Sequence, residues 1–368
     1  MTAAFSGALE ALRDLLSGVP GLGWVTYAPY AFRPFVLVVV LALVVGPVST
    51  IVNLRRLEFN AEAMVHSVFP GVVAAAVWWG TRMIIPGAAV AAVAATCALV
   101  AASRSKRENE AATAVVLATF FSIGVIISLR KGDMSGQLEA LMFGRLMEMS
   151  DERLMQSLIV CALALAALAL TWKEQVFVAH DRDGARVAGV RVLAVDIVIN
   201  AAIGAVVVAA SAAIGVLLVI GYVVVPGVGA RLAAPSATRM SATASGIALV
   251  GALSGLALMN APTARPVSPQ AALALTVIAV SAVVGGWGLL RERMRGPVGE
   301  PAAAPAEPQG DEGTAVEGAA LANPGGGERA AVEGAAALAP TDGEWSTDLA
   351  AASQSASASC RAPLGSPS

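Results

Sequence analysis

A stretch of 39 consecutive residues, 192–230, contains a single charged side chain, Asp196. A helix that crosses the roughly 30 Å hydrocarbon core of a bilayer needs about 20 apolar residues. The stretch therefore has room for two crossings, joined by a tight turn near Ala213 to Gly215. Similar runs recur along the chain, of which 57% is hydrophobic and 14% is charged. Because these runs are continuous rather than alternating, they predict membrane helices and exclude an ordinary soluble domain.

The apolar runs define about nine candidate spans. We expect an all-α integral membrane protein, a polytopic bundle of about nine transmembrane helices, with spans at roughly 34–54, 62–81, 83–103, 111–129, 154–172, 193–213, 215–231, 240–260 and 269–290. The chain then divides into an N-terminal surface segment (1–31), a transmembrane domain (32–295) and a C-terminal tail (296–368). Pro226 falls inside one span, where its missing backbone donor is expected to kink or interrupt the helix.

The two ends of the chain differ from the spans. Apolar residues recur at helical spacing near the N-terminus, which predicts a short helix on the membrane surface: Phe5, Leu9, Leu12, Leu15 and Leu16. The tail is rich in Ala, Gly, Pro, Ser and Glu, and it contains ten acidic residues and two arginines. With one aromatic residue, Trp345, it cannot bury enough apolar surface to fold and is predicted to be disordered.

Basic residues orient the bundle, because Lys and Arg in short loops stay on the cytoplasmic side. With the N-terminus outside and the C-terminus in the cytoplasm, 14 of the 22 basic residues before the tail fall on the cytoplasmic side. An odd number of spans agrees with termini on opposite sides. We therefore expect a multi-pass protein of the plasma membrane in this orientation.

Glu62 and His66 are the most informative polar residues of the predicted spans. An ionisable side chain inside a membrane is costly and is by default a functional candidate. Residues four apart lie on one face of a helix, and imidazole and carboxylate ligands suit zinc, iron or manganese. The pair could bind such an ion transiently. Alternatively, Glu62 lies among the lipid headgroups and His66 makes an ordinary hydrogen bond between helices.

Several other polar or small residues have competing interpretations. Asp196 and Asn200 could face a polar path, but they fit a hydrogen bond between helices better. His180, the second histidine, fits a solvated loop, and Gly251 and Gly255 have the small-residue spacing of closely packed helices. The predicted outer side has a loop with acidic residues that form either a docking surface or a solvated segment: Asp133, Glu139, Glu148, Asp151 and Glu152.

Motifs that the sequence lacks restrict its chemistry. No G-x-x-x-x-G-K-[ST] phosphate loop occurs, and the only lysines are Lys106, Lys131 and Lys173, so the chain is not expected to hydrolyse ATP. The cysteines have neither the spacing of a disulfide framework nor that of a zinc site: Cys97, Cys161 and Cys360. We expect no permanently bound cofactor and no nucleic-acid partner.

Four segments between about residues 30 and 290 resemble the permeases of zinc, manganese and iron ABC importers. The first, LRRLEFNAEAMVHSVFPGVVAA at 54–75, is similar to the family pattern of an arginine pair, Asp-Ala-x-x-His and Pro-Gly. The second is SRSKRENEAATAVVLATFFSIGVIISL at 103–129, and the third is LEALMFGRLMEMSDERL at 138–154. The fourth combines HDRDGARVAGVRV at 180–192 with IGVLLVIGYVVVPGVGARL at 214–232.

The resemblance implies that residues 32–295 form a permease domain in membrane lipid. A second permease copy, identical or paralogous, a separate cytoplasmic ABC ATPase subunit and an extracellular metal-binding protein would be its partners. Glu62, which stands where the family usually has aspartate, and His66 would line the translocation path and bind the transported divalent ion. The loop at 180–192 would form a short coupling helix that enters a cleft of the ATPase, with the coupling residues Asp181, Asp183, Ala185 and Gly189.

Two departures from the family leave the ion open. The last loop, MNAPTARPVSPQAA at 259–272, lacks the usual acid and glycine, and the eighth and ninth spans contain no buried carboxylate. One alternative is an ABC permease for a metal chelate or haem. Another is a secondary transporter that needs no ATPase, but this would predict paired broken helices in both halves, whereas one clear break, at Pro226, is evident.

Overall fold

The computed structural model describes residues 2–18, 23–27, 29–103, 109–130, 144, 146, 149–260 and 268–294. The chain divides into one unit of Met1–Glu300 and a second of Pro301–Ser368. The second unit, and with it most of the predicted disordered tail, lies outside the described residues. Every regular element in the described ranges is a helix: α1 (Thr2–Ser17), α2 (Gly23–Thr26), α3 (Pro29–Arg55), α4 (Glu58–Trp78), η1 (Thr81–Met83), α5 (Ile84–Ser103), α6 (Asn109–Arg130), α8 (Asp151–His180), α9 (Arg182–Val187), α10 (Val192–Ile214), α11 (Val216–Ala233), α12 (Ala237–Asn260) and α13 (Pro269–Met294).

The predicted all-α membrane fold is confirmed. Eight of the described helices are long and apolar enough to cross a membrane, namely α3, α4, α5, α6, α8, α10, α12 and α13. Helix α11 adds a shorter apolar segment, Leu218–Ala233, which agrees with the expected count of about nine. Backbone polar groups in lipid must be satisfied within the segment, which is why continuous apolar runs become helices.

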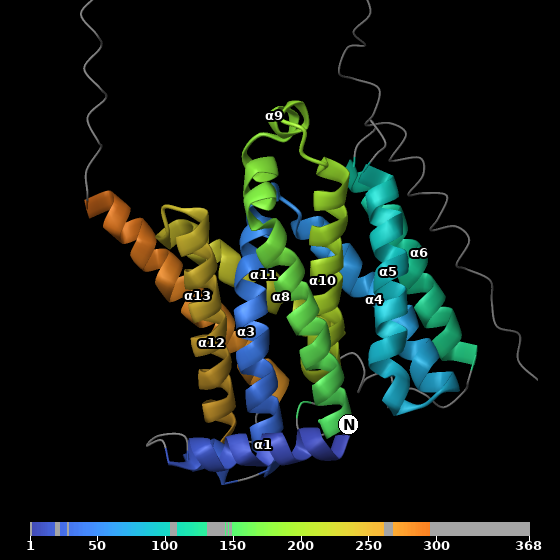
Figure 1. The fold of residues 1–368 in the computed structure, drawn as a ribbon, viewed down its shortest axis with the longest axis vertical. Coiled ribbons are helices and arrows are strands. Elements are labelled where there is room, and N and C mark those ends of the chain that lie inside the picture. Colours follow the sequence, from blue (N-terminus) through green and yellow to red (C-terminus); the bar gives the residue numbers. More distant parts are fainter. Residues whose placement is uncertain are drawn as a thin grey trace, which may run out of the picture. The chain divides into compact units, whose positions relative to one another are not determined.

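The membrane helices form a bundle in which consecutive helices run in opposite directions (Figure 1). Helices α4, α5 and α6 pack against one another, and α10 packs against both α5 and α8. Helix α3 packs against α8, α11 and α12, while α13 packs against α11 and α12. In Figure 1, α1 lies at one end of this bundle and α9 at the other.

Glycine allows close approach of several helices. A Cβ atom on Gly251 of α12 would lie 2.7 Å from Cα of Val277, and one on Gly255 would lie 2.6 Å from Cα of Leu273. Both of these contacts are to α13, so the small-residue spacing of the sequence does mark a helix interface. Larger side chains at either position would push α12 and α13 apart.

Two tight connections determine how neighbouring helices meet. Gly215, with φ of 88°, is the single residue between α10 and α11, as expected for this apolar stretch. The connection of α3 to α4 is formed by Arg56, with φ of 55°, and by Leu57, whose N–H donates to the Val52 carbonyl over 2.9 Å. This is the 6→1 bond of a Schellman motif, and it forms a compact corner between the end of α3 and the start of α4.

Helix α1 is amphipathic, as predicted from its apolar spacing. Leu9 is buried, and Phe5 and Leu16 pack against the same hydrophobic core. Leu12 and Leu15 are exposed, at 40% and 75%. One apolar face is therefore buried against the bundle and a second is uncovered; that α1 lies on the membrane surface stays a prediction.

Candidate functional site

Glu62 and His66 lie in the first half of α4. With a rise of about 1.5 Å per residue, they are roughly 6 and 12 Å beyond the start of the helix. Ala61, Ala63 and Met64 are fully buried against neighbouring helices, whereas Glu62 is exposed and His66 is half-buried. The two candidate ligands thus lie on a side of α4 that the rest of this chain leaves partly uncovered.

The His66 imidazole is held by aromatic contacts. Its ring lies 5.3 Å from that of Phe121 in α6, in an edge-on arrangement at 83°, and Phe121 in turn lies 5.5 Å from Phe69. The Nδ1 atom of His66 is buried and has no hydrogen-bond partner among the described residues. A buried polar atom without a partner is costly, and a neutral imidazole nitrogen is a common metal ligand.

One protomer does not supply a complete metal site in the described ranges. No group of three or more His, Cys, Asp or Glu side chains suited to hold an ion occurs there. Glu62 and His66 remain two donors one helical turn apart, while structural zinc sites use four ligands. The other histidine, His180, is the exposed last residue of α8 and is remote in sequence from this pair.

The predicted coupling loop contains the short helix α9, and Asp181 begins it. The Asp181 Oδ1 atom accepts hydrogen bonds from the N–H groups of Asp183 (3.1 Å) and Gly184 (2.8 Å). A carboxylate in this position satisfies donors that a helix N-terminus otherwise leaves free. Asp181 therefore has a structural task in this chain: it caps α9.

Two further residues predicted for coupling also support α9 itself. Ala185 is fully buried in a small cluster with Val178, Val192 and Val195. Gly189 has φ of 85° and ends the helix in a Schellman motif, in which the Val190 N–H donates to the Ala185 carbonyl over 3.0 Å. Ala185 thus faces the rest of this chain, so it is not available to a partner.

The outward surface of α9 consists of other residues. Val187 is 91% exposed, and beside it Arg186 pairs with Asp183 over 2.8 Å on the surface. Of the four predicted coupling residues, Asp183 is therefore the one whose side chain is both exposed and free of a capping or packing task. Val187 is not among the residues that the sequence predicts for coupling.

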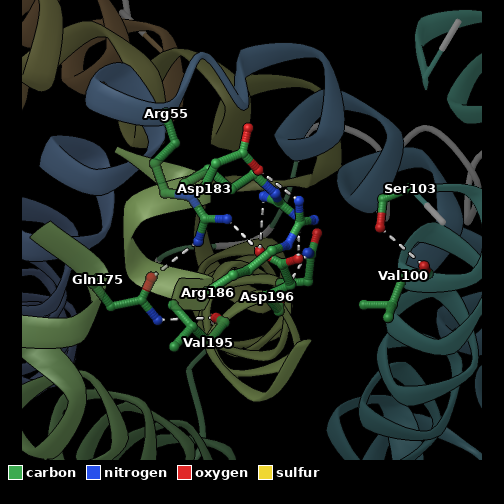
Figure 2. Close-up of polar contacts among 10 residues, drawn as sticks. Arg55, Val100, Ser103, Gln175, Asp183, Arg186, Val195 and Asp196 are labelled. Carbon is green, nitrogen blue, oxygen red and sulfur yellow. Dashed lines mark hydrogen bonds and ion pairs between the residues drawn. The ribbon is translucent and has the colours of Figure 1, made fainter. Parts of the chain in front are cut away.

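A buried ionic cluster lies where α3, α8, α9 and α10 meet. We call Arg55, Gln175, Arg182 and Asp196 the Asp196 cluster. Asp196 pairs with Arg55 through Oδ1 and with Arg182 through both oxygens, over 3.3 Å to Oδ1 and 2.5 Å to Oδ2. Gln175 accepts from Arg55 over 3.1 Å and donates to the Val195 carbonyl over 3.0 Å. Figure 2 shows Arg55 between Gln175 and Asp196, and Gln175 in contact with Val195.

This cluster explains the one charge in the long apolar stretch. A lone anion in a membrane segment requires a cation, and the sequence alone could not say that Arg55, 141 positions earlier, supplies it. The hydrogen bond between helices expected for Asp196 is present as an ion pair. Asn200, by contrast, donates to the Asp196 carbonyl of its own helix over 2.9 Å.

The turn around Pro226 in α11 is bound by side chains of α3. The Gly227 N–H donates to Ser49 Oγ over 2.7 Å, and the Val224 carbonyl accepts from Asn53 over 3.2 Å. The helix continues through Pro226, so the expected interruption does not end it. Polar residues of a neighbouring helix engage the backbone on both sides of the proline, as is common in membranes.

Acidic residues at the start of α8 are engaged in ion pairs. Asp151 pairs with Arg33 of α3 over 2.5 Å, and Glu152 pairs with Arg82 over 2.7 Å. These pairs attach the N-terminal end of α8 to its neighbours. The remaining acids of the predicted docking surface lie outside the described residues: Asp133, Glu139 and Glu148.

Comparison with known proteins assigns the chain to a family. The model of the ABC 3 transport family matches residues 28–286. The manganese transport system membrane protein MntC of Listeria monocytogenes is 27% identical over 219 residues, which cover 59% of this chain and 77% of the relative. The chelated iron transport system membrane protein YfeD of Yersinia pestis is 27% identical over 231 residues, covering 62% and 77%.

A solved structure has the same fold. PsaBC from Streptococcus pneumoniae, in complex with Fab, matches with a TM-score of 0.62 at 20% identity, covering 77% of this chain and 95% of that one. The matched family region, 28–286, includes α4 with Glu62 and His66, the helix α9 and the Asp196 cluster. This chain therefore belongs to the ABC 3 transport family and is a membrane permease subunit of an ABC transport system.

Proposed function

We propose that this permease imports a divalent transition-metal ion, namely zinc, manganese or iron. The observation that carries the proposal is the pair on α4: a Glu62 carboxylate one helical turn from a His66 imidazole whose Nδ1 atom is buried without a partner. Imidazole and carboxylate suit these ions. The names of relatives support the same class of cargo, since they refer to manganese and to chelated iron.

A second permease copy is proposed to complete the ligand set. One protomer offers two donors, and a two-fold axis beside α4 would bring the same two donors from its partner. Four ligands of imidazole and carboxylate type would then surround one ion. The exposure of Glu62 supports this arrangement, because an intramembrane carboxylate that its own chain leaves uncovered needs another neighbour.

The end of the bundle that contains α9 is proposed to face the cytoplasm. Many basic residues lie at this end of the helices: Arg55, Arg56, Lys173, Arg182, Arg186, Arg191, Arg231, Arg239, Arg291 and Arg293. Fewer described ones lie at the other end: Arg13, Arg33, Arg82, Arg130 and Arg153. The positive-inside rule then places the N-terminus outside and the end of α13 in the cytoplasm of a plasma-membrane protein.

A separate ABC ATPase subunit is proposed to bind α9. The full sequence contains no phosphate-binding loop, so the energy must come from another chain. Val187 is 91% exposed at a helix that extends from the membrane bundle, and an exposed apolar side chain beside an ion pair fits a protein partner better than water. An extracellular metal-binding protein is proposed to deliver the ion on the opposite side.

Transport of a metal chelate is the second candidate. The name of YfeD, a chelated iron transport system membrane protein, favours it. A chelate presents its own ligand atoms to the protein, so its import would not require donor atoms from Glu62 and His66. The dependence of uptake on these two side chains therefore separates the two candidates.

Metal accumulation in intact cells tests the proposal. A strain that lacks the gene is complemented with wild type, His66→Ala or His180→Ala, and cellular zinc, manganese and iron are measured by elemental analysis. We expect one metal to fall without the gene, to return with wild type and with His180→Ala, and to stay low with His66→Ala. His180 is the matched control, because it is the same residue type on an exposed helix end.

Two results would contradict free-ion import. If His66→Ala restores the metal as well as wild type does, the imidazole is not a ligand and the chelate candidate is favoured. If no metal changes in the deletion strain, the cargo is of another class. Membrane levels of each variant are measured in parallel, so that loss of the protein is not mistaken for loss of transport.

A further inference from the structure

Asp196 connects two elements that are far apart in the sequence. Arg182 is the first residue of α9, and Arg55 is the last residue of α3. The side chains of Arg55 and Asp196 are 5% and 8% exposed, while that of Arg182 is 42% exposed. The carboxylate therefore lies between a buried guanidinium of the bundle and a half-exposed one on the helix that protrudes from it.

Arg55 is connected to the candidate metal ligands through the backbone. After Arg55, only Arg56 and Leu57 precede the start of α4 at Glu58. The Schellman bond from Leu57 to Val52 keeps these residues in a compact corner. Glu62 follows one turn later, in the part of α4 that lies nearest to this corner.

Other contacts of α9 to the bundle are apolar and few. Ala185 packs in the small cluster with Val178, Val192 and Val195, whereas the Asp183–Arg186 pair is internal to α9 and lies on its surface. Among the described residues, Arg182 provides the polar contacts between α9 and the Asp196 cluster, with two hydrogen bonds of 3.3 and 2.5 Å to Asp196. The orientation of α9 relative to α3 thus depends on this carboxylate.

We propose that Asp196 is a positioning residue that couples α9 to α4: through Arg182 and Arg55 it joins the ATPase-facing helix to the corner between α3 and α4. A movement of α9 is then transmitted through these side chains to the part of α4 that carries Glu62 and His66. The inference rests on the proposed function, since it assigns α9 to the ATPase and α4 to the ion. It adds the residues that transmit the movement between them.

Hydrogen–deuterium exchange of the purified chain tests the mechanical part without any partner. Asp196→Asn and Arg182→Gln are expected to speed amide exchange in α9 at least tenfold. Arg33→Gln is the matched control, because it removes an arginine–carboxylate pair of similar geometry at the opposite end of α3. Unchanged exchange of α9 in Asp196→Asn and in Arg182→Gln would overturn the proposal, whatever the cargo.

Reconstitution tests the coupling itself. The permease with its ATPase and binding protein is placed in proteoliposomes, and uptake of Mn²⁺ and of Zn²⁺ is measured together with ATP hydrolysis. Asp196→Asn and Arg182→Gln are expected to lower the metal taken up per ATP hydrolysed about tenfold, with ATPase subunits still bound. Asp196→Glu keeps the charge and is expected to recover much of the ratio, while Arg33→Gln keeps the wild-type value.

The two assays separate the possible failures. A wild-type ratio in both Asp196→Asn and Arg182→Gln would refute the coupling role even if metal import is established. If wild type takes up neither metal, the proposed function fails, and faster exchange of α9 in Arg182→Gln would still support the positioning role. Arg182→Gln leaves the buried Arg55–Asp196 pair intact. Its effect therefore cannot be attributed to loss of that buried pair, as the effect of Asp196→Asn could be.

Discussion

At the residue scale, the negative charge of the Glu62 side chain should matter more for uptake than the length of that side chain. Glu62→Gln keeps the size but removes the anionic ligand, so we expect cellular accumulation of the metal to fall at least tenfold. Glu62→Asp keeps the charge one methylene further back and is expected to retain most of the uptake, with a changed ratio of manganese to zinc. Elemental analysis of complemented cells measures both.

Glu58→Gln is the control for this prediction. Glu58 is a half-buried acid one turn earlier on the same helix, and its neutralisation should leave accumulation near wild type. If Glu58→Gln and Glu62→Gln lower metal accumulation equally, uptake depends on negative charge near the start of α4. It would then not depend on a metal ligand at position 62. Wild-type uptake by Glu62→Gln would show that the Glu62 carboxylate does not bind the transported ion.

The sequence singles out Glu62, His66 and Asp196 because each is a polar side chain that interrupts an apolar pattern. For Asp196 the expected contact between helices is present, whereas the role of Glu62 and His66 in metal binding stays a prediction. The partners of Asp196 were not, because ion pairs over 141 and 14 positions depend on how helices pack and leave no periodic signal. For the predicted coupling residues Asp181, Ala185 and Gly189, capping, burial and a left-handed turn explain the residue type within this chain, and their role in coupling stays a prediction.

The contact of α12 with α13 gives a prediction at the scale of elements. A valine at Gly255 would place its Cβ 2.6 Å from Cα of Leu273, so the helices must separate and lose packing around that point. We expect Gly255→Val to destabilise the fold by about 1–3 kcal/mol and to lower the melting temperature in detergent by several degrees.

Gly246→Val is the control on the same helix. Apart from its chain neighbours and the backbone of its own helix, no atom lies within 4 Å of a Cβ at Gly246, so the same change in helix propensity occurs there without a clash. The difference between the two variants isolates the interhelical contact. Similar melting temperatures for both would show that α12 and α13 can move apart at little cost.

Element positions could be predicted well because each span is a continuous apolar run. Helix α8 is longer than its predicted span. The span was predicted at roughly 154–172, and the helix extends from Asp151 to His180, because a helix can continue into water once its apolar part is anchored. Gln175 is fully buried there, because Arg55 and the Val195 carbonyl satisfy its amide.

At the scale of the whole molecule, the orientation in the membrane can be tested by labelling. Single cysteines replace Tyr27, which is 93% exposed just before α3, or Val187, which is 91% exposed in α9, in a chain whose native cysteines have been replaced. A membrane-impermeant maleimide applied to intact cells should label Tyr27→Cys at once. In cells that lack the ATPase subunit, Val187→Cys should react only after permeabilisation, because the basic end of the bundle is expected in the cytoplasm.

The reverse labelling pattern would show that the protein has the opposite orientation in the membrane. Helix α9 would then lie outside the cell, where no cytoplasmic ATPase could bind it. Labelling of both positions in intact cells would be inconsistent with an odd number of crossings between residues 27 and 187. In this interval the structure has five of the candidate spans, α3, α4, α5, α6 and α8, so the two sites must lie on opposite sides if each one crosses. The experiment therefore tests at once the orientation and the crossing of the helices that carry Arg55, Glu62 and His66.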